Sequence, residues 1–445
     1  MNSLTARSAL YLQHKFEKNI PPVVSSKALT CIADYIASCL DARSSPSFAA
    51  STEQPVLGRC LQFGEPARAG AEDAAFSNAM RAHWIIRDDI HVPSATHIGS
   101  IVISAMLALA ESECLTGRNF VHGVIAGYEM MARLGTAVWQ GSAHRHFRPS
   151  GLSGPFGVAA AAIIALSLDE RAGANALGIA ANMASGLNQW PWSGGEEAAV
   201  HMGMAARSGL TAVALARLGL SPSPDIIEGE DGFLAAYAPN GWAGQCYADL
   251  LNDDWEILRI QHKPVAGCNL VQTPVAAALE LRTLHQIDPS KIREIVIETF
   301  PQAQSYPGCD SLGPFTSVQQ AKMSLQYAVA LALLKGTNDE AGYCDFHNPQ
   351  LLRLISATRL SVAREFDAAF PHTQPVRLTV KFAEGSAISR DMPDVPWLLE
   401  EDVWNRLRTI LDARSGRRRA DEIVRAIQGL ESADRVAELT SLFDF

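Results

Sequence analysis

The chain has 445 residues, with 47 Asp and Glu against 37 Lys and Arg, so its formal net charge is −10. With 48% hydrophobic and 19% charged residues, it has enough apolar content for a large core and too little charge for a disordered chain. Its acidity argues against nucleic acid as a partner, because general nucleic-acid binding needs a basic surface. The eight cysteines form no C-x-x-C pair, which suits a reducing compartment and predicts no local metal or iron–sulfur motif.

Neither the start of the chain nor its apolar segments indicate secretion or a membrane. The N-terminal residues lack the apolar block that defines a secretory signal. The longest apolar runs, such as Val158–Leu168, are shorter than the ~20 residues of a membrane span. We therefore expect a cytoplasmic protein with no membrane partner, and the mildly basic N-terminus leaves mitochondrial targeting open.

Up to about residue 258, the sequence predicts mainly buried helices. Segments rich in Ala, Leu, Ile and Met lack the alternation of half-buried strands and are apolar nearly all round. Ser193 followed by Glu196 predicts a capping box at the start of a further helix, Gly194–Leu218. The buried helices are expected at Ile98–Glu111, Phe120–Gln140, Phe156–Leu168 and Ala172–Leu187.

The pattern changes from about residue 259. Alternating β-branched residues predict strands at Arg293–Phe300 and Val376–Phe382, with Ala357–Glu365 as a third candidate. Between them, Val271–Leu284 and Ala321–Leu334 indicate amphipathic helices.

Helix returns in the C-terminal tail, so the predicted fold class is mostly α with an α+β part. Residues 1–258 and 397–445 are expected to form one large all-helical domain from both chain ends. Residues 259–396 are expected to form a smaller α+β lid domain inserted between them. A cleft where the two domains meet is the expected place for a small-molecule site.

A polar cluster directly precedes the apolar helix at Ile98. A histidine beside an acid can act as a general base near neutral pH, and a helix N-terminus favours a bound carboxylate. Two other interpretations remain open: the acids and the threonine cap the helix around a buried histidine, or the cluster binds a metal that has no evident fourth ligand. The cluster consists of Asp88, Asp89, His91, Thr96 and His97.

Four further residues are candidates for chemistry. Arg148 precedes a Gly-rich helix start and is either an anion contact or part of a solvated loop. His201 lies within a packed helix, where a lone histidine is usually a core residue. Lys263, on a Pro/Gly loop at the domain boundary, is a carboxylate partner, a base or a hinge residue. The Tyr306 phenol, in a loop after a predicted strand, is placed to donate to an enolate oxygen.

Several motifs occur in an order that resembles one known family, the MmgE/PrpD or 2-methylcitrate dehydratase family. It includes cis-aconitate decarboxylases and iminodisuccinate epimerases. The resemblance spans about residues 80–335. Its motifs are H-x4-D-D-I-H-V-P-S-A-T-H (His83 to His97), G-Y-E-M-M-A-R (Gly127–Arg133), F-R-P-S-G-L-S-G-P-F-G (Phe147–Gly157), H-M-G-M-A-A-R-S-G (His201–Gly209), E-G-E-D-G-F-L-A-A-Y-A (Glu228–Ala238), H-K-P-V-A-G-C (His262–Cys268) and S-V-Q-Q-A-K-M-S-L-Q-Y-A (Ser317–Ala328).

The resemblance implies a homodimeric enzyme without cofactor or metal, which acts beside a carboxylate of a small di- or tricarboxylic acid. It assigns catalytic roles to His97, Asp88, Asp89 and Lys263, and more approximately to Tyr306. Substrate contacts are expected from His91, Thr96, Arg148 and His201.

Three positions depart from the family pattern. Many members have an acid at Ile86, a histidine at Arg148 and a lysine at Ala198. The leading hypothesis is proton abstraction by His97 followed by elimination, as in a hydro-lyase or decarboxylase. The alternatives are an epimerase or isomerase of a substituted succinate such as iminodisuccinate, and a non-catalytic relative that binds a carboxylate.

Overall fold

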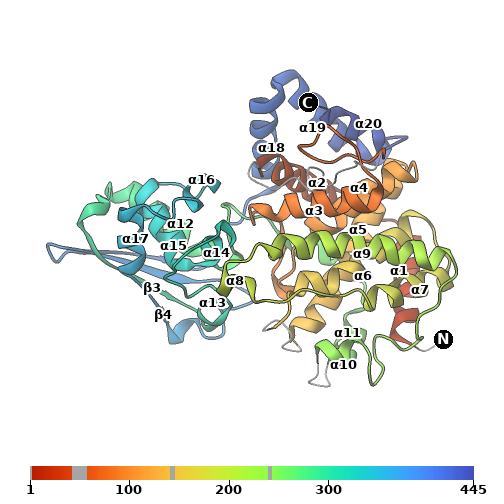
Figure 1. Ribbon diagram of the computed structural model, residues 1–445, viewed down its shortest axis with the longest axis horizontal. Coiled ribbons are helices and arrows are strands. Elements are labelled where there is room, and N and C mark those ends of the chain that lie inside the picture. Colours follow the sequence, from red (N-terminus) through yellow and green to blue (C-terminus); the bar gives the residue numbers. More distant parts are fainter. Residues whose placement is uncertain (1–2, 43–57, 141–145, 239–242, 445) are drawn as a thin grey trace.

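The computed structural model describes residues 3–42, 58–140, 146–238 and 243–444. The chain is 61% helical, with a small mixed sheet in its C-terminal region, which confirms the predicted fold class. Figure 1 shows a large helical part beside a smaller part that contains the sheet. The exact domain boundaries at 258 and 397 stay a prediction.

The helical part is built around buried, apolar helices from both ends of the chain (Figure 1). α4 and α6 are buried along nearly their whole length, as their Ala- and Ile-rich sequences require. The C-terminal α18 packs against α2 near the N-terminus. The helices are α1 (Leu4–Glu17), α2 (Pro22–Asp41), α3 (Ala71–Trp84), α4 (Ile98–Ser112), α5 (Gly117–Gln140), α6 (Pro149–Ala165), α7 (Glu170–Ala181), α8 (Trp190–Ser193), α9 (Glu197–Arg217), α10 (Phe233–Tyr237), α11 (Ala243–Leu250), α18 (Glu400–Ser415), α19 (Arg417–Gln428) and α20 (Ala437–Thr440).

Among the described residues, α2 is the one helix long and apolar enough to cross a membrane by length and composition. However, 78% of its most apolar window is buried inside the fold. Its apolar surface is therefore covered by the helices packed on it, among them α3 and α18.

Two predicted helix starts are wrong. Ser193 ends α8 instead of capping the next helix, and Glu196 is the N-cap of α9 without a side-chain hydrogen bond. The predicted capping box is therefore absent, because a separate short helix uses Ser193. α6 begins at Pro149, seven residues before the predicted Phe156, since a proline is well accommodated in the first turn of a helix.

The α+β part contains a four-stranded sheet of order β4-β3-β5-β6. β3 pairs parallel to β4 and antiparallel to β5, which pairs antiparallel to β6. The sequence did not indicate β6, because this strand is largely exposed and lacks apolar alternation. The strands are β3 (Ile292–Thr299), β4 (Thr358–Val362), β5 (Val376–Phe382) and β6 (Ala387–Met392).

Helices cover this sheet and form a second core with it (Figure 1). The predicted helix over Ala321–Leu334 is two helices, because Ser324 ends one and caps the next by accepting from the Tyr327 amide at 3.0 Å. The helices are α12 (Gln272–His285), α13 (Pro301–Ser305), α14 (Val318–Met323), α15 (Leu325–Lys335), α16 (Glu340–Tyr343) and α17 (Pro349–Ser356).

Candidate active site

The loop between α3 and α4, residues 85–97, is joined to the boundary loop that carries Lys263. Within it, β1 (Ile90–His91) pairs antiparallel with β2 (Ile260–Gln261). Ile86 has a φ of 51°, a left-handed conformation that is rare for a β-branched residue and costs about 1–3 kcal/mol. The Lys263 ammonium donates to the Ile86 carbonyl at 2.8 Å, which helps hold this conformation.

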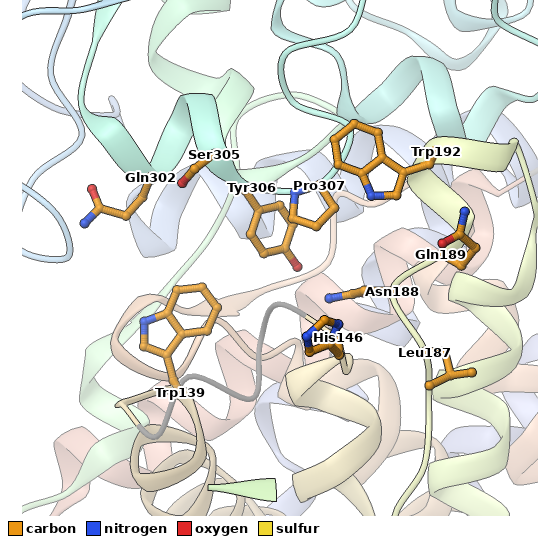
Figure 2. A pocket seen from close by; sticks show the side chains of 10 residues that line it. All are labelled: Trp139, His146, Leu187, Asn188, Gln189, Trp192, Gln302, Ser305, Tyr306 and Pro307. Carbon is orange, nitrogen blue, oxygen red and sulfur yellow. The ribbon is translucent and has the colours of Figure 1, made fainter. Parts of the chain in front are cut away.

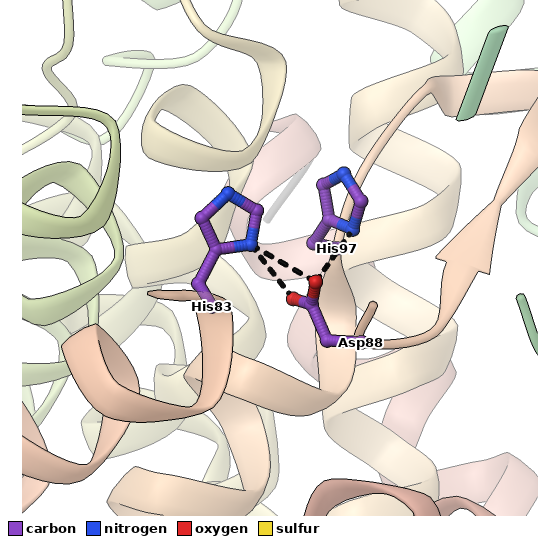
Figure 3. A group of neighbouring side chains, drawn as sticks. All are labelled: His83, Asp88 and His97. Atoms are coloured by element: carbon purple, nitrogen blue, oxygen red, sulfur yellow. Dashed lines mark hydrogen bonds and ion pairs between the residues drawn. The ribbon is translucent and has the colours of Figure 1, made fainter. Parts of the chain in front are cut away.

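His83, Asp88 and His97 form a buried trio with the carboxylate between the two imidazoles (Figure 3). His83 Nδ1 lies 2.8 Å from Asp88 Oδ2, and His97 Nδ1 lies 3.4 Å from Asp88 Oδ1. The Ser100 hydroxyl also donates to Asp88. Burial alone would raise the pKa of Asp88, but its contacts with the two imidazoles and the nearby Lys263 lower it, so Asp88 is a carboxylate.

The hydrogen bonds assign the protons of both imidazoles. Arg148 NH2 lies 2.6 Å from His83 Nε2, which must therefore accept, while His83 Nδ1 donates to Asp88. His97 Nδ1 donates to the Asp89 carbonyl at 2.9 Å. Burial lowers the pKa of both histidines, so both are neutral near pH 7. The remaining nitrogen of His97, Nε2, is on the far side of the ring from Asp88 (Figure 3).

Two buried cations adjoin the trio. Lys263 Nζ is 4.0 Å from Asp88 Oδ1 and is fully buried, and burial lowers its pKa. Arg148 is 5% exposed, with its guanidinium 5.1 Å from the centre of the Trp190 ring. The ligand atoms of His83, Asp88 and His97 lie within 4.8 Å of one another, close enough for a metal site. The donors already bond one another and two cations adjoin them, so the trio fits a bound anion better than a metal.

Two neighbouring cavities lie where the helical and α+β parts face each other, and one of them is lined by His97 of the trio. An inner cavity of about 50 Å³ is lined by His97 and Arg148 and by apolar side chains that include Ile86. An outer cavity of about 690 Å³ is lined by residues of both parts (Figure 2). Trp139 and Tyr306 line both cavities, and the centres of their rings lie 6.4 Å apart.

Two domain models of one protein family match most of this chain. The MmgE/PrpD N-terminal domain matches residues 9–244, and the MmgE/PrpD C-terminal domain matches residues 266–396. The chain belongs to the MmgE/PrpD family.

Three curated relatives have low sequence identity to this MmgE/PrpD chain. A protein from Aspergillus oryzae (strain ATCC 42149 / RIB 40), described as "Cis-aconitate decarboxylase-like protein oryM", is 24% identical over 418 residues, which cover 86% of this chain and 85% of the relative. The cis-aconitate decarboxylases of Homo sapiens and Mus musculus are each 25% identical over 395 residues, covering 83% of this chain and 78% of each relative. At this distance, the family and its general enzyme character carry over, and the exact reaction does not.

Of the nine predicted site residues, only His97, Arg148 and Tyr306 are among the described residues that line the cavities. Asp88 and Lys263 lie next to His97 without lining either cavity, and Asp89, His91 and Thr96 bond within the fold. The Asp89 carboxylate accepts from the Gly99 amide at 3.0 Å and from the Tyr128 hydroxyl, and burial raises its pKa to about 7. Thr96 Oγ1 is 2.6 Å from Ser94 Oγ. His91 bonds Ser94 through Nδ1 and Glu256 through Nε2. None of the three predicted residues lines the two cavities in the described part of the chain.

Tyr306 and His201 are the remaining predicted site residues near the trio of His83, Asp88 and His97. Tyr306 comes from the α+β part, and burial raises the pKa of its phenol to about 12, so it is protonated at neutral pH. His201 is half-buried, and burial, followed by the Arg148 charge, lowers its pKa to about 4. His201 Nδ1 is buried and has no hydrogen-bond partner among the described residues.

Two residues near the site received no role from the sequence. His83 opens the H-x4-D-D motif, and its spacing to Asp88 was the available signal. Lys322 on α14 is buried and donates to the Trp84 carbonyl at 3.1 Å, beside Gln319, which donates to the same oxygen at 2.9 Å. Burial lowers the pKa of Lys322 to about 8. The rarity of lysine in this chain was the signal that could have singled out Lys322.

Proposed function

We propose that the protein abstracts a proton from the carbon next to a carboxylate of a small carboxylic acid, with His97 as the base. One observation carries this proposal: His97 is fixed through Nδ1, while its Nε2 is left for a substrate in a cavity that also holds Arg148. The Asp88 carboxylate, 3.4 Å from Nδ1, would stabilise the imidazolium that forms. Arg148 would hold the substrate carboxylate and stabilise the enolate-like state.

Elimination is the first candidate for the step after proton abstraction, as either loss of water or decarboxylation. The similarity to cis-aconitate decarboxylases supports a lyase of this kind. In dehydration, His97 takes the α-proton and the β-hydroxyl leaves as water with a proton from the protonated Tyr306. In the decarboxylation of an alkene acid, the bond to the departing CO2 breaks and Tyr306 supplies the proton that the remaining carbon chain takes up. The predicted homodimer remains part of this proposal.

Epimerisation is the second candidate, and Tyr306 favours it. Tyr306 lines the same inner cavity as His97 but comes from the α+β part, and its phenol is protonated at neutral pH. An acid opposite a base is what return of a proton to the other face requires.

Incubation of the protein with a panel of hydroxy-, imino- and unsaturated carboxylic acids in D2O, followed by NMR, tests the proposal. Deuterium at the α-carbon is expected, and it should be lost in a His97→Gln variant. Alkene or CO2 formation would indicate elimination, while deuterated, inverted starting material would indicate epimerisation. Binding of acids without exchange or turnover of any of them would contradict the proposal and support a non-catalytic carboxylate binder.

A further inference from the structure

Two loops of the α+β side bring a pair of cysteine thiols together. Cys268 Sγ lies 4.0 Å from Cys309 Sγ, although the two residues are 41 positions apart in the sequence. Each cysteine directly follows a glycine with a left-handed φ, 120° at Gly267 and 77° at Gly308, which turns the chain just before the thiol. A disulfide bond is about 2.05 Å long, so each sulfur needs to move by only about 1 Å to form one.

The backbone of both cysteines is held at the junction of α14 and α15. The Cys268 amide donates to the Lys322 carbonyl at 2.9 Å. The Leu325 amide donates to the Cys309 carbonyl at 3.0 Å, and the Cys309 amide donates to the Tyr306 carbonyl at 3.1 Å. Because the same pair of helices fixes both backbones, the contact between the thiols is a constant feature of the folded protein.

The two thiols differ in their surroundings. Cys268 is 7% exposed and lines the inner cavity, whereas Cys309 is fully buried and is not among the described residues that line either cavity. A hydrogen bond from Cys309 lowers the pKa of the Cys268 thiol, and the charges of Lys263 and Arg148 lower it further. Burial raises the pKa of the Cys309 thiol well above its usual range. Since the thiolate is the form that attacks an oxidant, Cys268 is the thiol that a small peroxide would oxidise first.

Oxidation of Cys268 beyond the first step would damage the cavity. A sulfenic acid that meets a second peroxide becomes a sulfinic acid, which ordinary thiol reductants do not reverse. A sulfinate on Cys268 would be a fixed anion in the inner cavity of about 50 Å³, where it would compete with a substrate carboxylate for Arg148. A disulfide is uncharged and is reduced by thiols, so it avoids this outcome.

We propose that Cys268 and Cys309 form a reversible dithiol–disulfide pair, in which Cys309 protects Cys268 from irreversible oxidation by peroxides. The Cys268 sulfur attacks one oxygen of hydrogen peroxide, the O–O bond breaks, and the thiol proton leaves with the other oxygen as water. The Cys309 sulfur then attacks the Cys268 sulfur, the S–O bond of the sulfenic acid breaks, and a second water leaves with the Cys309 proton. Two thiols are thereby oxidised to one disulfide, and one peroxide is reduced to two waters. This pair goes beyond the proposed function and does not depend on it.

Mass spectrometry of the full chain tests the pairing without any variant. The reduced protein is treated with hydrogen peroxide, free thiols are blocked with N-ethylmaleimide, and the protein is digested. We expect a peptide pair joined through Cys268 and Cys309, which dithiothreitol separates. Absence of this pair at a peroxide concentration that oxidises the exposed Cys114 and Cys344 would overturn the proposal.

The variant Cys309→Ser tests the protective role. Without its partner, Cys268 should accumulate about tenfold more sulfinate than in the parent protein at the same peroxide dose. Cys344→Ser, which removes an exposed thiol, is the matched control and should leave both the joined peptides and the sulfinate content unchanged. Equal sulfinate in Cys309→Ser and the parent protein would overturn the protective role.

The variant Cys268→Ser tests which thiol reacts first. Cys309 should then be oxidised about tenfold more slowly than Cys268 is in Cys309→Ser, because Cys309 is fully buried and protonated. Circular dichroism before oxidation checks that both variants are folded. Equal oxidation rates of the two single thiols in folded variants would contradict the assigned order of the two steps.

Discussion

Two buried histidines of the same loop, His91 and His97, each lie beside a carboxylate, and they differ in how the histidine is used. His91 bonds through both nitrogens, to Ser94 at 2.8 Å and to Glu256 at 3.1 Å. His97 bonds through Nδ1 alone, lies beside Asp88, and lines a cavity. Proximity to an acid therefore does not identify a base, whereas a nitrogen left available at a cavity does.

The charged residues around the two histidines also differ: those near His91 pair with one another, whereas one near His97 lines a cavity. Glu256 continues into a buried ion network, in which Arg133 contacts Glu256 at 3.0 Å and Glu129 at 2.9 Å. Lys15 lies 3.7 Å from Glu129. Each charge in this network has a partner within the fold, which is how a structural cluster lowers the cost of burial. The Asp88 cluster instead places Arg148 at a cavity, where a ligand can meet it.

Replacement of the two histidines should give the largest contrast. His97→Gln is expected to lower the rate of α-deuterium exchange by about 100- to 10,000-fold with little change in stability. His91→Gln should lower the free energy of unfolding by about 1–3 kcal/mol, because Glu256 loses a buried partner, with the exchange rate of the folded protein retained. Exchange assays and urea unfolding measure both. Equal rate losses in the two variants would remove the distinction.

The ion network should contribute to stability alone. Arg133→Met removes the one guanidinium that contacts both buried carboxylates, Glu129 and Glu256, and we expect a loss of about 3–5 kcal/mol in the free energy of unfolding. Urea denaturation followed by circular dichroism measures this loss. Arg259→Met, at a guanidinium that is about half exposed and also contacts Glu256, is the matched control and should cost less than about 1 kcal/mol.

Replacement of the two adjacent acids, Asp88 and Asp89, should likewise affect the exchange rate unequally. Asp88→Asn is expected to slow exchange about 100-fold, because it removes the anion that stabilises the His97 imidazolium. Asp89→Asn should retain the rate within about threefold, since the Asp89 side chain bonds Gly99 and Tyr128 and is close to half protonated at pH 7. A comparable loss in both variants would restore Asp89 as a catalytic residue.

The pH dependence is the smallest of these expected effects. An ordinary histidine of pKa 6.5 would be about tenfold less available as a base at pH 5.5 than at pH 7.5. Because burial lowers the pKa of His97 well below that value, the exchange rate should change less than about twofold between these pH values. A tenfold fall over this range would show that His97 titrates normally and would contradict its neutral, desolvated state.

The lowered pKa of His201 should also make the stability of the protein depend on pH. Its pKa is lowered to about 4 in the folded protein, so between pH 6.5 and 4 the unfolded chain binds more protons than the folded one. The stability associated with neutral His201 is therefore present above pH 6.5 and lost as the pH falls. His201→Asn should reduce the decline in the free energy of unfolding over this interval, as measured by urea titrations at several pH values.

The sequence predicted most of the fold, because long apolar helices and alternating strands have a local signal. β5 was predicted with its exact bounds, and α4 within one residue at its C-terminal end. The largely exposed β6 and the break at Ser324 lacked such a signal. They depend on a neighbouring strand and on a side-chain cap.

Prediction of the site from sequence had a different limit. The loop sequence predicted a catalytic role for Asp88 and Asp89 alike, because adjacent residues have the same sequence context. Their side chains point to different partners in the fold: Tyr128 on α5 bonds Asp89, and His83 on α3 bonds Asp88. Tyr306 and Arg148 are far apart in sequence, and only the contact between the two parts of the molecule places them at one cavity.

The hydrogen bonds from Lys263, Lys322 and Gln319 have a mechanical consequence. These three side chains belong to the α+β side of the molecule, yet they donate to carbonyls of Trp84 and Ile86, directly before Asp88. Any movement of α14 away from α3 must break the bonds of Lys322 and Gln319 to the Trp84 carbonyl, so the end of α3 that leads into the Asp88 loop is tied to α14.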